Sequence, residues 1–406
     1  MSLNLLLQEC KNESLSGAKW RLLRRSIVKS LLTQGDSTIA DLSLNIQSSI
    51  PTVTKAINEL LYDQIVEDLG KVANTGGRRP SLYSVIPTSG FLLGVDVGRT
   101  SLSLGLQNIK NEFVFEELNK SFILEENQKS LEELVLHIRS FLARSGVDKN
   151  KIIAACVSVS GRVDSEEGVS DKPFFNTQKP FAKDLTERIG LPVILENDTR
   201  VMTWGEYAQG NIGKEENVIF LNYDWGVSIG IVINGKLYYG KSGYSGEFGH
   251  SPLFDNKTLC YCGKEGCLET EVSGGVLVKQ FRDELAKGRQ SLIDKTNPDL
   301  TYKDILNGAL VQEDSLCLDL ITTQCEKMGK HLAMLLNLFN PGTLIIGGEF
   351  SLLKDFVLLP IQASIRKYSV SLVTKDVNIK LSESGGRSAL IGTCYVVKER
   401  LLAMLA

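Results

Sequence analysis

The 406-residue sequence lacks any apolar run near the ~20 residues that a membrane-spanning helix requires. It also lacks the basic and then apolar start of a secretory leader, so we expect a cytoplasmic protein without membrane association. A surplus of one charge sign is missing too, because 45 Lys and Arg stand against 48 Asp and Glu. With a net charge of −3, any contact with nucleic acid must come from a local basic patch.

Cysteine is sparse, and five of the eight cysteines are isolated among mostly apolar neighbours, which is typical of reduced core thiols: Cys10, Cys156, Cys317, Cys325 and Cys394. The other three form the stretch Cys260-Tyr-Cys262-Gly-Lys-Glu-Gly-Cys267. In a cytosolic chain, such a cluster indicates a metal site before it indicates a disulfide.

His250 completes this cluster to one imidazole and three thiols, a closed tetrahedral ligand set for structural zinc. Gly263 and Gly266 allow the short loop to turn between the ligands. A reduced loop without metal is the alternative. Zinc would also hold Glu247 and Glu269, whose carboxylates could accept hydrogen bonds from sugar hydroxyls. One ring nitrogen of His250 could bind zinc while the other faces a hydroxyl.

Residues 20–86 have the pattern of a winged helix-turn-helix. Three segments with apolar residues every three or four positions predict three helices: Leu23, Ile27 and Leu31; Ile39, Leu42 and Ile46; Val53, Ile57, Leu60 and Leu61. Gly35-Asp36-Ser37 could cap the second helix, and Ser49 could cap the third. Extended runs at 64–69 and 82–86 would form the wing.

Four polar residues share the side of the third helix opposite its apolar stripe: Thr52, Thr54, Lys55 and Asn58. The short side chains there could reach base edges while Lys55 contacts a phosphate. Arg78 and Arg79 at the tip of the wing suit a minor groove or its flanking phosphates. The combination predicts binding to operator DNA, and an interaction module without DNA contact is the alternative.

After residue 88 the pattern changes to that of an α/β protein. Apolar runs predict strands at 91–95, 101–107, 152–159, 193–195, 218–221, 227–233 and 343–346. Helical stretches lie between them at 131–145, 200–209, 275–287 and 316–339. Alternation of strands and helices predicts an α/β domain, and the sequence shows no internal repeat or low-complexity tract.

Glu196-Asn197-Asp198 follows the run at 193–195, so we expect these side chains at the carboxyl end of a strand, where α/β proteins bind ligands. Asp198 could take a proton from a sugar hydroxyl and activate it for attack on phosphorus. By itself the tripeptide could equally be an ordinary polar loop.

Together these residues resemble the ROK family of repressors, open reading frames and sugar kinases, specifically its NagC/Mlc/XylR-type transcriptional repressors. The most specific stretch is Glu247-Phe-Gly249-His250 followed by Cys260-x-Cys262-Gly-x-x-Gly266-Cys267-Leu-Glu269. The resemblance implies a winged helix-turn-helix at 1–88 and an actin- and hexokinase-like (ASKHA) fold after it. That fold would have one lobe at 89–198 plus 385–406, and a second at 199–384 with the zinc and sugar sites.

The resemblance also implies six sugar-binding residues: Gly161, Asn197, Asp198, Glu247, His250 and Glu269. The stretch Ser158-Val-Ser160-Gly161-Arg-Val-Asp164 is similar to the family loop Gly-x-Pro-Gly-x-Val-Asp, with Ser160 in place of proline. Structural zinc would be bound by His250, Cys260, Cys262 and Cys267.

Two phosphate loops of the family kinases are altered in this sequence. The first reads Asp96-Val-Gly98-Arg99-Thr100 where the kinases have Asp-x-Gly-Gly-Thr. The second reads Asp224-Trp225-Gly226-Val-Ser-Ile-Gly230 where they have Gly-Thr-Gly-x-Gly. Trp225 would fill space that a nucleotide needs, and Asp224 would repel its phosphates. The stretch Gly347-Gly348-Glu349 resembles a border of the kinase nucleotide site. Binding of ATP and Mg²⁺ is therefore not expected, and Asp198 would be a sugar ligand and not a base.

The leading hypothesis is a sugar-responsive repressor of carbohydrate metabolism genes with a vestigial kinase domain that binds its inducer, a sugar or sugar phosphate. A homodimer or homotetramer is expected on operator DNA. The alternative is an ATP-dependent sugar kinase, of glucokinase or N-acetylhexosamine kinase type, with a regulatory DNA-binding head. A third hypothesis is release from DNA by a protein partner, for which the apolar segment 3–7 could be a docking site.

Overall fold

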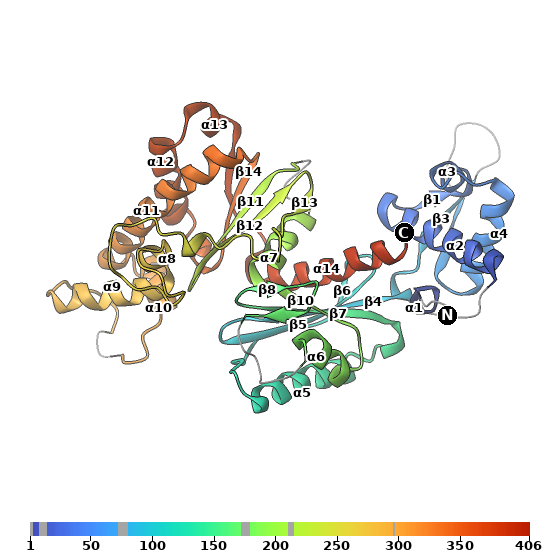
Figure 1. Cartoon of the computed structure of the whole chain (residues 1–406), viewed down its shortest axis with the longest axis horizontal. Helices are drawn as coiled ribbons and strands as arrows, with labels where there is room; N and C mark the ends of the chain where they lie inside the picture. Colours follow the sequence, from blue (N-terminus) through green and yellow to red (C-terminus); the bar gives the residue numbers. More distant parts are fainter. Residues whose placement is uncertain (1–2, 8–13, 72–79, 172–178, 210–214, 295–296) are drawn as a thin grey trace. The chain divides into compact units, whose positions relative to one another are not determined.

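The computed structural model describes residues 3–7, 14–71, 80–171, 179–209, 215–294 and 297–406. The chain divides into two compact units. The first comprises Met1–Asp198 and Leu390–Ala406, and the second comprises Thr199–Ala389. Figure 1 follows the chain through both. Within the described ranges, no helix has the length and apolar character needed to cross a membrane.

The first unit begins with the helices and strands predicted for a winged helix-turn-helix. Its helices are α1 (Leu3–Leu7), α2 (Leu15–Gln34), α3 (Ile39–Asn45) and α4 (Ile50–Tyr62). Its three strands are β1 (Ser37–Thr38), β2 (Val66–Lys71) and β3 (Ser81–Val85). They form an antiparallel sheet of order β1-β3-β2. As predicted, the Ser49 hydroxyl caps α4 by accepting the Thr52 N–H. The predicted cap of α3 is wrong, because Ser37 pairs with Tyr83 in the sheet and Thr38 forms a reciprocal capping box with Asp41.

Helix α1 is packed against its own chain. Its leucines Leu3, Leu6 and Leu7 are buried, and only Leu5 is largely exposed. The buried Arg25 of α2 donates hydrogen bonds to the carbonyls of Leu6 and Leu7 at 2.9 and 2.6 Å. Three of the four leucines are therefore already in internal contacts, so they do not offer the docking face suggested by the sequence.

The rest of the first unit is built on a five-stranded sheet of order β10-β7-β4-β5-β6. The strands are β4 (Phe91–Val97), β5 (Ser101–Asn108), β6 (Phe113–Ser121), β7 (Ile152–Val159) and β10 (Val193–Asn197). Helices α5 (Gln128–Ser145) and α6 (Phe181–Ile189) cover one face, and α14 (Ser388–Met404) covers the other (Figure 1). Gly94 lets α14 approach closely, since a Cβ there would lie 2.4 Å from the Thr393 hydroxyl. A small ribbon of β8 (Val163–Asp164) and β9 (Val169–Ser170) follows β7.

The second unit has a five-stranded sheet of order β13-β12-β11-β14-β15. Its strands are β11 (Val218–Tyr223), β12 (Val227–Ile233), β13 (Lys236–Leu237), β14 (Thr343–Gly347) and β15 (Asn378–Leu381). Its helices are α7 (Asp198–Ala208), α8 (Glu269–Val272), α9 (Gly274–Ala286), α10 (Tyr302–Val311), α11 (Ser315–Phe339), α12 (Asp355–Tyr368) and α13 (Ser371–Asp376). The main core of this unit joins the sheet to α11 and α12 on one face. On the other face α7 packs so closely that a Cβ on Gly230 would lie 1.8 Å from the Thr203 hydroxyl.

The two large sheets have the same topology, although the sequence shows no repeat. In each, a central strand pairs antiparallel with the next strand, which pairs antiparallel with the one after it. On its other side the central strand pairs parallel with a later strand, which pairs parallel with the last strand of the sheet. These central strands are β4 and β11. The α/β class and every strand that the apolar runs predicted are confirmed. The edge strand β6 was missed because its apolar run ends after residue 115 and its half-buried residues include polar ones.

Candidate functional site

Helix α4 presents the four polar residues predicted to face DNA. Lys55 and Asn58 are exposed, whereas Thr52 and Thr54 are half-buried. The Thr54 hydroxyl donates to the Ile50 carbonyl at 2.7 Å, which leaves its methyl group and its oxygen lone pairs for an outside contact. The Lys55 ammonium lies 4.9 Å from the centre of the Trp20 ring of α2. Arg78 and Arg79 lie outside the described residues.

Three of the predicted sugar ligands meet in the first unit. The Asn197 amide donates to the Gly161 carbonyl at 2.9 Å and to the Asp198 carboxylate at 3.0 Å. Asn197 is the last residue of β10, and Asp198 begins α7, so the tripeptide starts inside the strand and not after it. Gly161, just beyond β7, has a φ of 109°, a backbone conformation that favours glycine.

Ser160 also belongs to this group, a contact that the sequence did not predict. Its hydroxyl donates to the Asp198 carboxylate at 2.7 Å. A proline, as in the family loop, has no donor to offer here. The replacement was visible in the sequence, but only the structure shows that the new hydroxyl holds Asp198.

Asp96 of the first phosphate loop lies at the end of β4, paired in register with Ser158 of β7. The Ser158 hydroxyl donates to the Asp96 carboxylate at 2.5 Å. Burial raises the pKa of Asp96 to about 6, and the hydrogen bond from Ser158 opposes this rise while the charge of Asp198 adds to it. In the same loop, Gly98 packs beside the Ser101 hydroxyl and the Thr100 carbonyl accepts the Phe122 N–H.

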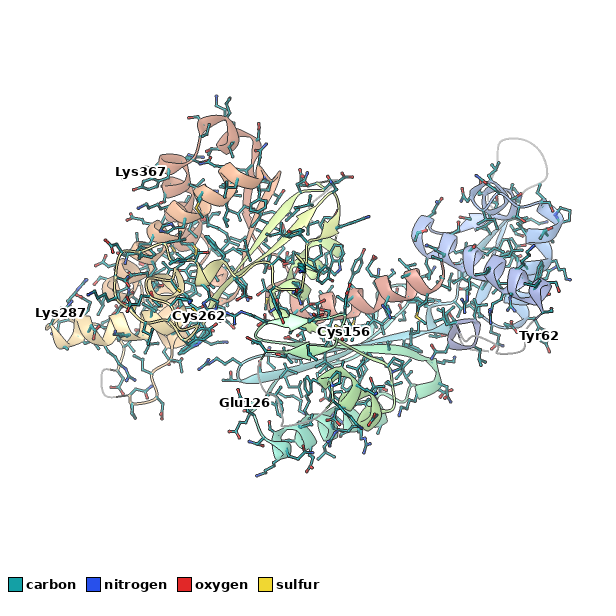
Figure 2. All side chains as sticks on the ribbon, viewed as in Figure 1. Tyr62, Glu126, Cys156, Cys262, Lys287 and Lys367 are labelled. Atoms are coloured by element: carbon teal, nitrogen blue, oxygen red, sulfur yellow. The ribbon has the colours of Figure 1, made fainter. Side chains whose placement is uncertain are left out.

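The second unit brings together the four predicted metal ligands. The ligand atoms of His250, Cys260, Cys262 and Cys267 all lie within 4.8 Å of one another. Figure 2 labels Cys262 in this loop. The Cys262 and Cys267 sulfurs are 3.7 Å apart, close to the ~3.8 Å edge of a tetrahedron with Zn–S bonds of ~2.3 Å. Burial and the neighbouring thiols raise the pKa of Cys267 to about 12, a crowding that a cation would relieve. The donor set therefore fits zinc.

The two ring nitrogens of His250 face different groups. Its Nδ1 lies 3.5 Å from the Cys260 sulfur, within the metal cluster. Its Nε2 lies 2.9 Å from the Tyr261 hydroxyl and 3.7 Å from the Glu247 carboxylate. One nitrogen thus faces a predicted metal ligand, while the other faces protein groups, and its contact with a sugar hydroxyl stays a prediction.

Glu269, the first residue of α8, is the last of the predicted sugar residues in the second unit. Its carboxylate accepts the Val227 N–H at 3.0 Å. Burial raises the pKa of Glu269, and this hydrogen bond opposes the rise. Glycines make room for it: a Cβ on Gly226 would lie 3.0 Å from Glu269 Oε2, and one on Gly249 would lie 3.2 Å from it. Gly226 of the second phosphate loop thus has a structural reason to be glycine that involves no phosphate.

Comparisons with known proteins agree with this geometry. The sequence profile of the ROK family matches residues 92–400. This chain belongs to the ROK family. A xylose repressor of Caldicellulosiruptor bescii is 27% identical over 380 residues, covering 93% of this chain and 95% of that protein. Among solved structures, a ROK family transcriptional regulator, described as a homolog of E. coli Mlc, has a TM-score of 0.77 and 24% identity, covering 95% and 97% of the two chains.

A ROK family glucokinase from Streptomyces griseus, solved in complex with glucose and AMPPNP, is also similar. It is 27% identical with a TM-score of 0.64, and the match covers 76% of this chain and 100% of that one. The winged-helix part of this ROK chain accounts for much of the difference in coverage. The kinase-like fold inferred from the sequence is therefore confirmed.

We expect the substitution Asp96→Asn to stabilise the protein at pH 7.5. Because the folded-state pKa of Asp96 is raised to about 6, the folded protein loses stability as pH rises from 4 to 6, where it holds a proton that the unfolded chain has released. The ionised carboxylate then costs on the order of 1–3 kcal/mol above pH 6. The amide avoids this cost and still accepts the Ser158 hydrogen bond.

Thermal unfolding should show a higher Tm for the variant at pH 7.5, and a smaller gain at pH 5. The exposed Asp376→Asn is the control, and a variant less stable than wild type at pH 7.5 would contradict the prediction.

Proposed function

We propose that this ROK chain is a sugar-responsive, DNA-binding transcriptional repressor of carbohydrate metabolism genes. The observation that carries the proposal is the union, in one chain, of a helix-turn-helix with an exposed polar face and a fold shared with a sugar kinase. A relative named a xylose repressor aligns over 93% of the chain, which includes both parts. The proposed division places the DNA-binding domain at 1–88, one kinase-like lobe at 89–198 with 385–406, and the second lobe at 199–384.

The residues proposed to bind the inducer form two groups, one within each unit. Gly161, Asn197 and Asp198 supply a carbonyl, an amide and a carboxylate, and Ser160 orients the last of these. Glu247, His250 and Glu269 supply two carboxylates and an imidazole, next to the metal ligands. Such groups suit the hydroxyls of pentoses and hexoses alike, so a sugar or a sugar phosphate is proposed without naming one.

Structural zinc is proposed for the Cys260, Cys262, Cys267 and His250 cluster. It would neutralise the crowded thiolates and hold the loop that carries Glu269. A homodimer or homotetramer is proposed for the DNA-bound form, because winged helices commonly read two half-sites about one helical turn apart. Release from DNA by a protein partner is a further proposal. The leucines of α1 are not proposed as the surface that this partner contacts.

The alternative function is an ATP-dependent sugar kinase with a regulatory head. It draws support from Asp198, whose position on the carboxyl edge beside Ser160 would suit a catalytic base. A coupled phosphorylation assay separates the two functions. Turnover abolished by Asp198→Asn would favour the kinase, and absence of turnover with every sugar tested favours the repressor.

The role of α4 is tested with DNA fragments that the wild-type protein selects from a genomic library. Lys55→Ala should weaken binding to such a fragment and lower the salt dependence, the slope of log K against log salt, by about 1, because one phosphate contact is lost. Asn58→Ala should weaken discrimination between bases by ~1–3 kcal/mol and leave the slope unchanged. Lys129→Ala, an exposed lysine of α5, is the control. Unchanged affinity in both variants would rule out α4 as the DNA-reading helix.

The sugar response is tested by titrating pentoses, hexoses and their phosphates into the complex with such a fragment. One of them should raise the dissociation constant for DNA by ~100-fold, which corresponds to ~2.7 kcal/mol of coupling. Asp198→Asn and Glu269→Gln should bind DNA normally but lose this response, while Asp376→Asn keeps it. If no sugar changes the affinity for DNA, the inducer proposal fails.

Zinc is tested by metal analysis of the purified protein. We expect about one zinc ion per chain in the wild type and in Cys156→Ala, a buried cysteine outside the cluster. Cys262→Ala should lose most of the metal, and the sugar response should weaken with it because Glu269 is no longer held. A full complement of zinc in Cys262→Ala would disprove the assigned ligand set.

A further inference from the structure

The turn between β11 and β12 holds a half-buried carboxylate that neither the zinc nor the sugar proposal uses. Asp224 is the first residue after β11, and its carboxylate receives hydrogen bonds from three separate segments. The Trp225 N–H donates to Oδ1 at 2.6 Å, and the Tyr302 hydroxyl of α10 donates to the same oxygen. The Glu349 N–H, at the start of the 3-10 helix η4 (Glu349–Leu353), donates to Oδ2 at 3.4 Å.

Two of these donors are backbone amides at the carboxyl ends of neighbouring parallel strands. β11 pairs in parallel with β14, so the residues that follow the two strands emerge side by side. Gly348 makes the approach possible, because it has a φ of 79° and a Cβ there would lie 2.3 Å from the Tyr223 carbonyl. Backbone amides that converge in this way are a common means of binding an anion.

Aromatic side chains lie next to Asp224 in the turn and in the two segments that donate to it. Tyr223 and Phe350 stack with ring centres 3.9 Å apart, and Trp225 meets Tyr302 edge-on at 5.9 Å. Burial raises the pKa of Asp224, and the hydrogen bonds from Tyr302 and Trp225 oppose the rise. The neighbouring Glu349 carboxylate is turned to Lys303, with an N–O distance of 2.5 Å, so it does not compete for these donors.

The same turn also accepts hydrogen bonds from the first amides of α9. The Gly274 N–H donates to the Asp224 carbonyl at 3.0 Å, and the Gly275 N–H donates to the Trp225 carbonyl at 3.3 Å. A Cβ on Gly275 would lie 3.2 Å from the Trp225 ring. The helix amides that an external anion could otherwise use are therefore engaged by the turn itself.

We propose that the β11–β12 turn, η4 and α10 form an anion cradle that the chain fills with its own Asp224 carboxylate. Asp224 is thus a positioning residue that joins three segments without an external phosphate or carboxylate ligand. This proposal rests on the proposed function, because a repressor, unlike a kinase, needs no nucleotide phosphate at this turn. It also revises the role expected for Asp224, from repelling phosphates to replacing them.

Asp224→Gly removes a CH₂COO⁻ group and leaves space of the size of acetate. In chloride we expect the Tm of this variant to fall by about 5 °C. Acetate at equal ionic strength should restore at least ~2 °C in the variant, because it binds the folded state, and should not shift the wild type. Inorganic phosphate is tested in the same way. A larger rise in Tm for Asp224→Gly than for the wild type would show that the cradle also accepts phosphate. Asp376→Gly, an exposed aspartate of α13, is the matched control and should show no response to acetate.

Asp224→Asn keeps the shape of the side chain and covers the case in which the glycine variant does not fold. Its Tm should fall by ~2 °C or more, because its NH₂ group would face a backbone N–H. Tyr302→Phe, which removes one donor and keeps the carboxylate, should lose stability without any response to acetate. A fully stable Asp224→Asn, or equal acetate shifts in Asp224→Gly and the wild type, would overturn the proposal. The measurements use neither DNA nor sugar, so their failure would leave the proposed function standing.

Discussion

Parallel strands that end at a common sheet edge bring together the polar groups described in both units. Neighbouring strands are only ~4.8 Å apart, so residues that leave adjacent strand ends are within hydrogen-bonding reach. In the first unit, β4, β7 and β10 end next to Asp96, Ser160 and Asn197, which are separated by up to a hundred residues of sequence. In the second unit, β11 and β14 end at Asp224 and Glu349 in the same manner. The shared topology of the two sheets produces two comparable polar edges. At the first, Ser160 orients Asp198, and at the second, the Asp224 carboxylate accepts the hydrogen bonds that the edge offers.

Close backbone approach is the second constraint, and it explains several glycines of the second unit. Gly226 and Gly249 leave space for the Glu269 carboxylate, and Gly230 leaves space for Thr203 of α7. Gly226 and Gly230 belong to the stretch that corresponds to a phosphate loop in the family kinases. Their retention in this chain follows from packing, so glycine at these positions is not evidence for nucleotide binding.

The metal cluster and the proposed sugar residues of the second unit lie on one short stretch of chain. His250 contributes one nitrogen to the thiol cluster and turns the other toward Glu247, while Glu269 follows Cys267 by two residues. Carboxylates bind hydroxyls well only when they are held in position before the ligand arrives. Phe248 and Leu268 of this stretch belong to the core of the unit, and zinc would add order to the loop between them. That is a physical reason for a structural metal site beside the proposed sugar residues.

The sequence by itself determined the local features, because periodicity, capping residues and ligand spacing act over a few residues. It predicted α4 and its cap, the main strands, and the set of His250 and three cysteines. It predicted the wrong cap for α3, although the Thr38–Asp41 capping box is local, and the pairing of Ser37 with Tyr83 lies 46 positions apart in the chain. It also could not show that Ser160 holds Asp198, or that Asp224 is enclosed by donors from α10 and η4. Those contacts join residues 38 to 125 positions apart, and their geometry is decided only when the sheets bring the strand ends together.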